Sequence, residues 1–189
     1  MQYQIDSIEQ IKNEFIAIKV RAVLLFKDLS DKQFNFKPVP DKWSAAECLE
    51  HLNLTGSGYL KNIQRKKDHD INENHQSLQN YKLRYPLRKF AELTGPDTKI
   101  KMPAPKFLQA STSNLSKDVY ERFVKVQENF IEIISGAQLN DLGRIKVKWP
   151  AFRVMNLHLG EVLIMTLAHQ LRHLNQAERV LKSYSDFQK

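Results

Sequence analysis

Apolar residues recur three and four positions apart along four long stretches of the chain, which is the period of an amphipathic α-helix. The stretches run from about Ile5 to Leu29, from Ala45 to about Lys67, from Ser116 to Ser135 and from about Leu159 to Ser183. The stripe of the first stretch is Ile8, Ile11, Phe15, Ile18, Ala22, Leu25 and Leu29. The third stretch repeats the same alternation, and helices with matching heptad-like stripes pack at about +20° in a left-handed bundle. The pattern therefore predicts an all-α protein built on four long helices.

Local signals mark where two of these helices begin. Ser44, followed three residues later by Glu47, has the pattern of a capping box, and Trp43 before it can act as a hydrophobic anchor. His158 and Glu161 stand in the same relation at the start of the fourth helix. We therefore interpret His158 as a helix-start residue and not as a metal ligand.

The connection between the second and third long helices, residues 68–114, is long and irregular. Within it, Pro86 to Leu93 predicts a short helix, with Pro86 at its first position and Gly95 just beyond its end. Because a connection of this length in a compact domain often covers a binding site, we expect a lid or crossover packed on the helices. Two other expectations are a surface connection over Asp31 to Lys42 and a left-handed cap at Gly136.

Length and composition indicate one globular domain over residues 1–189, with 42% hydrophobic and 26% charged residues. A single cysteine, Cys48, excludes an internal disulfide framework and suits a reducing compartment. The first residues lack the pattern of a secretory signal, and the apolar runs are too short to span a bilayer. We expect a soluble, cytoplasmic protein without membrane association.

The net charge of +8 would permit binding to nucleic acid or another polyanion. The basic residues are spread along the chain, however, and no nucleic-acid-binding motif accompanies them. Two small clusters, at Arg65–Lys67 and at Arg144, Lys146 and Lys148, are typical of solvated surfaces. Nucleic-acid binding is therefore kept as a third, weaker interpretation.

His169 and His173 in the fourth helix are the main candidates for chemistry. Residues four apart lie one turn apart on the same face, so both imidazoles can bind one divalent metal. Both occupy the inward stripe of their helix, where a buried polar ring must be hydrogen-bonded or bound to metal. His51 in the second helix is the candidate third partner, provided that the fold brings the three together. The alternative is a core or surface pair of histidines without metal.

Three histidine ligands would leave a fourth coordination position open, as in catalytic metal sites. Cys48, one turn before His51, could approach the same ion or be a small buried side chain. Gln176, one turn beyond His173, is either an outer partner of the site or a polar residue at a helix edge. No general base can be named, because Glu47 serves as a cap and Glu50 lies on another face.

Three segments together resemble the DinB-like superfamily, the damage-inducible, YfiT-type group of bacterial four-helix proteins. They are residues 43–52 (WSAAECLEHL), the Trp149–Pro150 pair, and the late helix from Glu161 through the His-x-x-x-His motif to Gln176. The tryptophan-serine helix start leads to the first histidine, and the second and third follow about 120 residues later in the expected order. The resemblance covers both defining motifs and essentially the whole chain.

The resemblance implies an up-up-down-down bundle and a divalent metal, often nickel or zinc, on the positions matched by His51, His169 and His173. It also implies frequent homodimers and a small-molecule substrate. Members of the group include metal-dependent hydrolases and transferases that add low-molecular-weight thiols to electrophiles. A non-catalytic bundle with a structural or vestigial metal site is the alternative, and residues 68–114 match no substrate motif.

Overall fold

The structure, a computed structural model, describes residues 3–64, 78–96, 98, 100, 103–150 and 155–187. Four long helices dominate this part of the chain: α1 (Ile8–Phe26), α3 (Ala45–Gln64), α5 (Asp118–Ser135) and α7 (Leu159–Phe187). They coincide with the four periodic stretches to within a few residues, and the all-α prediction is confirmed. No helix among the described residues is both long enough and apolar enough to cross a membrane.

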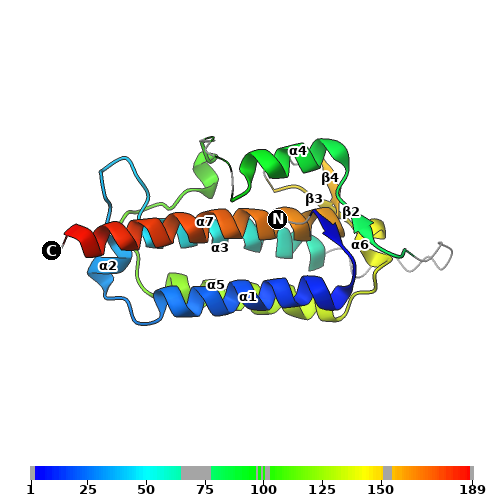
Figure 1. The fold of residues 1–189 in the computed structure, drawn as a ribbon, viewed down its shortest axis with the longest axis horizontal. Helices are drawn as coiled ribbons and strands as arrows, with labels where there is room; N and C mark the ends of the chain where they lie inside the picture. Colours follow the sequence, from blue (N-terminus) through cyan, green and yellow to red (C-terminus); the bar gives the residue numbers. More distant parts are fainter. Residues whose placement is uncertain are drawn as a thin grey trace.

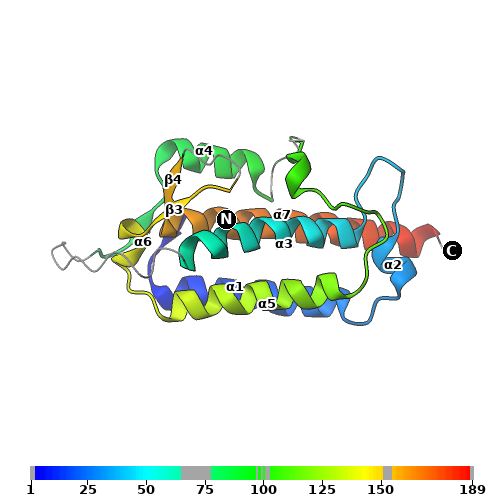
Figure 2. The ribbon, with the colours of Figure 1, turned by 180° about the vertical axis from the view of Figure 1, so that it is seen from behind.

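The long helices lie side by side in two layers. Helix α1 packs against α5 and α7, and α3 packs against the same two helices. Figures 1 and 2 show α1 with α5 in one layer and α3 with α7 in the other. The apolar stripes meet between these layers, where Phe15, Phe123 and Phe130 are completely buried.

The predicted up-up-down-down order is wrong. The short connection between α1 and α3 lies at one end of the molecule, where Phe36 packs on Tyr184 near the end of α7 and Asn35 bonds the backbone of Leu115 just before α5. Thus α1 and α7 end where α3 and α5 begin, which gives an up-down-down-up order (Figure 1). The 18 residues between α1 and α3 include a helix and turn back at this end, whereas the long connection before α5 returns the chain along the whole bundle.

Helix α3 approaches α5 closely at Gly56. A Cβ atom at this position would lie 2.7 Å from Cγ1 of Val126 and 3.5 Å from the ring of Phe130. Such an approach leaves no room for a side chain, so glycine sets the spacing of these two helices.

Several short elements lie outside the four periodic stretches. Strand β1 (Gln4–Ile5) pairs antiparallel with β2 (Tyr81–Lys82), and β3 (Lys146–Lys148) pairs antiparallel with β4 (Asn156–His158). The additional helices are α2 (Asp31–Asn35), α4 (Tyr85–Thr94), η1 (Lys106–Leu108, a 3₁₀ turn) and α6 (Asp141–Arg144). Strands of two or three residues are too short to show a periodic pattern, so the sequence did not predict them.

Helix α4 confirms the short helix predicted within the long connection, with Pro86 in its first turn and Gly95 at its end. The left-handed cap expected at Gly136 is wrong, because this residue has φ −91° and ψ 0°. Its N–H still bonds the carbonyl of Glu132, so α5 ends by continuing its helical hydrogen bonding and not by reversing its backbone.

Candidate metal centre

Helices α3 and α7 place the three predicted histidines in one cluster. His169 and His173 lie one turn apart on the face of α7 that packs against α3, and His51 faces them from the second turn of α3. The side chains of His51 and His173 are buried, and that of His169 is half-buried. Because α3 and α7 run antiparallel, two residues about 120 positions apart in sequence become neighbours.

The Nε2 atoms of the three rings converge. Nε2 of His169 lies 3.0 Å from Nε2 of His51 and 3.1 Å from Nε2 of His173. One ligand atom from each histidine lies within 4.8 Å of the other two, a spacing at which one ion can contact all three. The structure therefore brings together the residues that the sequence had singled out.

Hydrogen bonds at Nδ1 determine which nitrogen of two rings faces the cluster. Nδ1 of His51 lies 2.6 Å from the carbonyl oxygen of Leu108. A carbonyl only accepts, so Nδ1 carries the hydrogen and Nε2 of the neutral ring keeps a lone pair. Nδ1 of His173 is 3.1 Å from Oε1 of Gln176, with the same consequence. The Nε2 lone pairs of His51 and His173 thus both point at the ring of His169.

Without a cation, this arrangement is hard to satisfy. A single N–H at Nε2 of His169 would have to serve two acceptors, the Nε2 atoms of His51 and His173. One divalent cation, by contrast, accepts all three lone pairs at once. The donor set consists of three neutral imidazoles, and those of His51 and His173 are held by hydrogen bonds at their outer nitrogens. Protein zinc and nickel sites use imidazoles in this way.

Burial keeps the three imidazoles uncharged. The pKa of His173 is lowered from 6.5 to about 3, by desolvation first and then by the neighbouring His51 and Arg172. The pKa of His169 lies well below its usual value because of desolvation first and then of the other two histidines. Desolvation also lowers the pKa of His51, against a smaller opposing effect of its hydrogen bond to Leu108. All three are therefore in the form that binds metal without first losing a proton.

Two contributors to the cluster were not predicted. Leu108 belongs to η1 in the long connection, so the expected lid or crossover supplies a backbone acceptor to the cluster. The indole ring of Trp43, expected to serve as a helix-start anchor, lies against the rings of His51 and His173. Sequence gives no signal for a backbone carbonyl, whereas an aromatic residue eight positions before a candidate ligand could have been considered.

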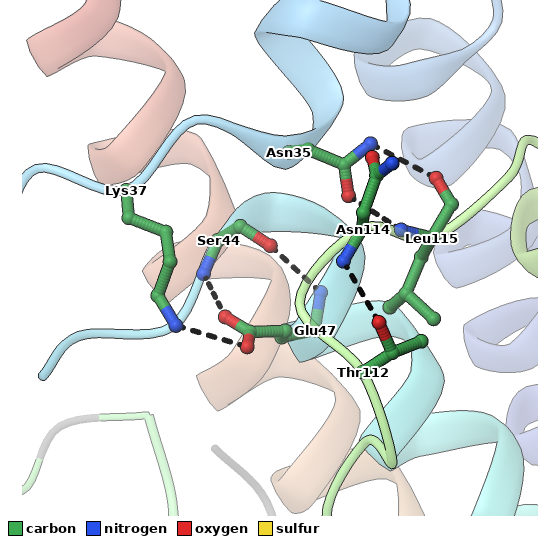
Figure 3. A network of polar contacts seen from close by, with 7 residues as sticks. All are labelled: Asn35, Lys37, Ser44, Glu47, Thr112, Asn114 and Leu115. Atoms are coloured by element: carbon green, nitrogen blue, oxygen red, sulfur yellow. Dashed lines mark hydrogen bonds and ion pairs between the residues drawn. The ribbon is translucent and has the colours of Figure 1, made fainter. Parts of the chain in front are cut away.

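Helix α3 begins as predicted. The N–H of Glu47 donates to Oγ of Ser44 at 3.1 Å, and the N–H of Ser44 donates to Oε2 of Glu47 at 2.7 Å. Lys37 adds an ion pair to Oε1 of Glu47 at 3.0 Å (Figure 3). Nearby, the side chain of Asn35 joins the backbone of Leu115 in the same view. Glu47 is thus fully engaged in starting the helix.

The other residues considered earlier lie apart from the cluster. Cys48 is buried, burial raises the pKa of its thiol, and it does not belong to the three-histidine group. Glu50 forms an ion pair with Arg122 of α5. The backbone N–H of His158 donates to Oε2 of Glu161 at 2.8 Å, which confirms the helix-start interpretation. Two further histidines, His69 and His75, stand among polar residues in the sequence and lie outside the described residues.

Comparison with known proteins relates the chain to a family and to a bacterial protein. The sequence model of a family described as the DinB superfamily matches residues 18–177. Uncharacterized protein YuaE of Bacillus subtilis (strain 168) is 27% identical over 158 residues, which cover 82% of this chain and 86% of YuaE. The family match spans His51, both histidines of α7 and Gln176.

Proposed function

The chain belongs to the DinB superfamily, and from this premise we propose that it binds one divalent transition metal, nickel or zinc, on His51, His169 and His173. The observation that carries the proposal is the convergence of three Nε2 atoms from two helices. Family membership supports the choice of positions, and the neutral state of the rings supports their readiness to bind.

The chain's own residues would hold the site in a defined way. Leu108 and Gln176 accept the Nδ1 hydrogens of His51 and His173 and keep both Nε2 lone pairs directed inward. The burial of His51 and His173 limits the access of water to their rings. A divalent metal bound there would supply Lewis acidity, which lowers the pKa of a bound water or stabilises a thiolate.

We further propose that the protein is a metal-dependent enzyme, either a hydrolase or a transferase that uses a low-molecular-weight thiol. Closed structural zinc sites are held by four protein ligands, commonly cysteines. Among the described residues, the metal-binding group contains three histidines and no cysteine or carboxylate. That donor set leaves room for a water, thiol or substrate atom on the metal, which favours a catalytic role.

Metal analysis of protein purified without a histidine tag tests the proposal. We expect close to one transition metal per chain in the wild type and an almost complete loss in His173→Ala. His158→Ala is the matched control, because this histidine precedes the same helix and its side chain lies outside the cluster. A wild-type protein that stays metal-free after incubation with Ni²⁺ or Zn²⁺ would refute the proposal.

The same samples distinguish a catalytic site from a structural or vestigial one. Removal of the metal with a chelator should leave the helical signal in circular dichroism and most of the thermal stability in place, because the apolar core is extensive. Collapse of the fold on metal removal would favour a structural site. Screens for hydrolysis and for thiol transfer to electrophiles then address the reaction class.

Further properties are proposed from the family resemblance and the composition. We propose that the four long helices form a bundle of DinB type, that residues 1–189 make up one domain, and that the protein acts on a small-molecule substrate. The protein is a homodimer, which sedimentation analysis tests. Its compartment is the cytoplasm, in keeping with the single buried Cys48.

A further inference from the structure

Trp43 makes ring contacts with two of the three clustered histidines. Its indole is nearly parallel to the imidazole of His173, with ring centroids 5.6 Å apart and an interplanar angle of 25°. The centroid of His51 is 5.0 Å away, at 52°. The tryptophan side chain is half-buried, so one part of it covers the imidazoles and another part reaches the surface.

These contacts differ from those expected of a helix-start anchor. A hydrophobic residue just before a capping box packs on the first turn of its own helix. The indole of Trp43 extends beyond α3 to His173, which belongs to α7. Its position is therefore explained by the histidine cluster and not by the start of α3 alone.

The backbone before Trp43 and after it is tied down. Ser44 is completely buried and exchanges two hydrogen bonds with Glu47, which also pairs with Lys37 (Figure 3). This network fixes the direction in which the chain enters α3. The indole is thereby presented to the imidazoles by a rigid segment, and its rotamer is limited by the rings that it touches.

The hydrogen bond at Nδ1 does not by itself fix the plane of an imidazole ring. The bonds from Nδ1 to Leu108 and Gln176 fix one atom of each ring, and the ring can still tilt about that atom. A flat aromatic surface against the ring face removes this tilt. Since a metal ligand must direct its lone pair at the ion, loss of the surface weakens binding even though every ligand remains.

We infer that Trp43 is a positioning residue of the metal centre, which holds the ring planes of His51 and His173 and excludes water from their faces. The inference rests on the proposed function, because it requires that the cluster bind metal. It adds a residue from outside the ligand set and its hydrogen-bonded partners. The hydrogen bonds between Ser44 and Glu47 then contribute to the site indirectly, because they fix the backbone that carries Trp43.

Cobalt binding tests the inference through affinity and spectrum together. Co²⁺ is titrated into metal-free wild type, Trp43→Ala and Trp43→Phe, and its visible absorption is recorded. We expect Trp43→Ala to bind about tenfold or more weakly, with an altered absorption band, in line with the effect of losing outer partners of metal ligands. Phenylalanine, which keeps a flat ring, should restore most of the affinity and the wild-type band.

Fluorescence supplies a measurement that keeps the indole in place. The chain has two tryptophans, so Trp149→Phe leaves Trp43 as the only tryptophan, whose emission is selected by excitation at wavelengths that tyrosine does not absorb. Paramagnetic Co²⁺ bound beside the ring should quench this emission at one equivalent. In Trp43→Phe, the remaining Trp149 packs on Phe90 of α4 and should respond much less.

The outcomes separate this inference from the proposed function. If wild type fails to bind Co²⁺, both are overturned. If wild type binds but Trp43→Ala matches it in affinity and spectrum, or if Trp149→Phe binds without quenching, only the role of Trp43 is overturned. Should Trp43→Ala fail to fold, as judged by circular dichroism of the metal-free protein, the quenching experiment alone decides.

Discussion

Replacing His173 by glutamine should reduce the pH dependence of stability in the metal-free protein. In the folded chain, desolvation first, and then His51 and Arg172, hold the pKa of His173 at about 3, below its ordinary value of 6.5. The unfolded chain therefore takes up a proton between pH 6.5 and 3 that the folded chain does not. The free energy of unfolding must fall as pH falls through this window and be fully retained above it.

The size of the change in the free energy of unfolding follows from the one proton that each histidine binds in the unfolded chain and not in the folded one. A difference of one proton between the two states changes the free energy of unfolding by about 1.4 kcal/mol per pH unit. Between about pH 6.5 and 4.5 the His173 contribution amounts to about 2 kcal/mol. Since the pKa values of His51 and His169 are lowered as well, the wild type should lose more than this amount.

Urea unfolding of chelator-treated protein measures the effect. Wild type and His173→Gln are unfolded at several pH values from about 7 to 4.5, and the two free energies are subtracted at each pH to remove the contribution of the carboxylates. The difference should change by about 2 kcal/mol over the window. For His158→Gln, in which the replaced ring is only partly buried, the difference from wild type should vary less with pH than it does for His173→Gln. Parallel curves for wild type and His173→Gln would refute the linkage.

Two further predictions concern the contact between the long connection and α7. Gly160→Ala should destabilise the protein by about 1–3 kcal/mol in thermal unfolding, because the new Cβ would lie 2.5 Å from Cε1 of the buried Tyr81 ring. The control is Gly143→Ala, whose new Cβ would lie 3.7 Å from the same ring and should leave the stability nearly unchanged. Arg84→Ala should lower the free energy of unfolding by about 1–3 kcal/mol, because it leaves the fully buried carboxylate of Glu161 without its cation. Adding Glu161→Gln, which removes the buried charge, should recover part of this loss. A double mutant less stable than Arg84→Ala would contradict the reasoning.

Periodicity located the four long helices because each buries a continuous stripe over many turns, so many residues carry the same signal. The capping residues Ser44 and Glu47 were equally readable, since a capping box is a local hydrogen-bonding arrangement within four residues. The two short sheets were not. A pair such as Ile5 with Tyr81 depends on contacts between distant segments, and two residues are too few to reveal alternation.

The histidine cluster divides in the same way. Spacing alone placed His169 and His173 on one face of a helix, and His51 was already the candidate third partner before the resemblance to a family matched all three positions. The hydrogen bond from His51 to the carbonyl of Leu108 left no mark in the sequence, because every residue has a carbonyl. The contact of Trp43 with His173 required the tertiary arrangement, which turned an expected helix-start anchor into a neighbour of the site.

The sequence by itself determined which segments are helical, where α3 begins and which imidazoles can face inward, since these properties depend on residues within a few turns of one another. Only the tertiary structure decided the up-down-down-up order, the meeting of α3 with α7 and the identity of the groups that hold the rings. Helix direction depends on the path that each connection takes through space, which residues close in sequence do not specify. Ring orientation depends partly on backbone groups, which are alike at every position and therefore leave no signal in the sequence.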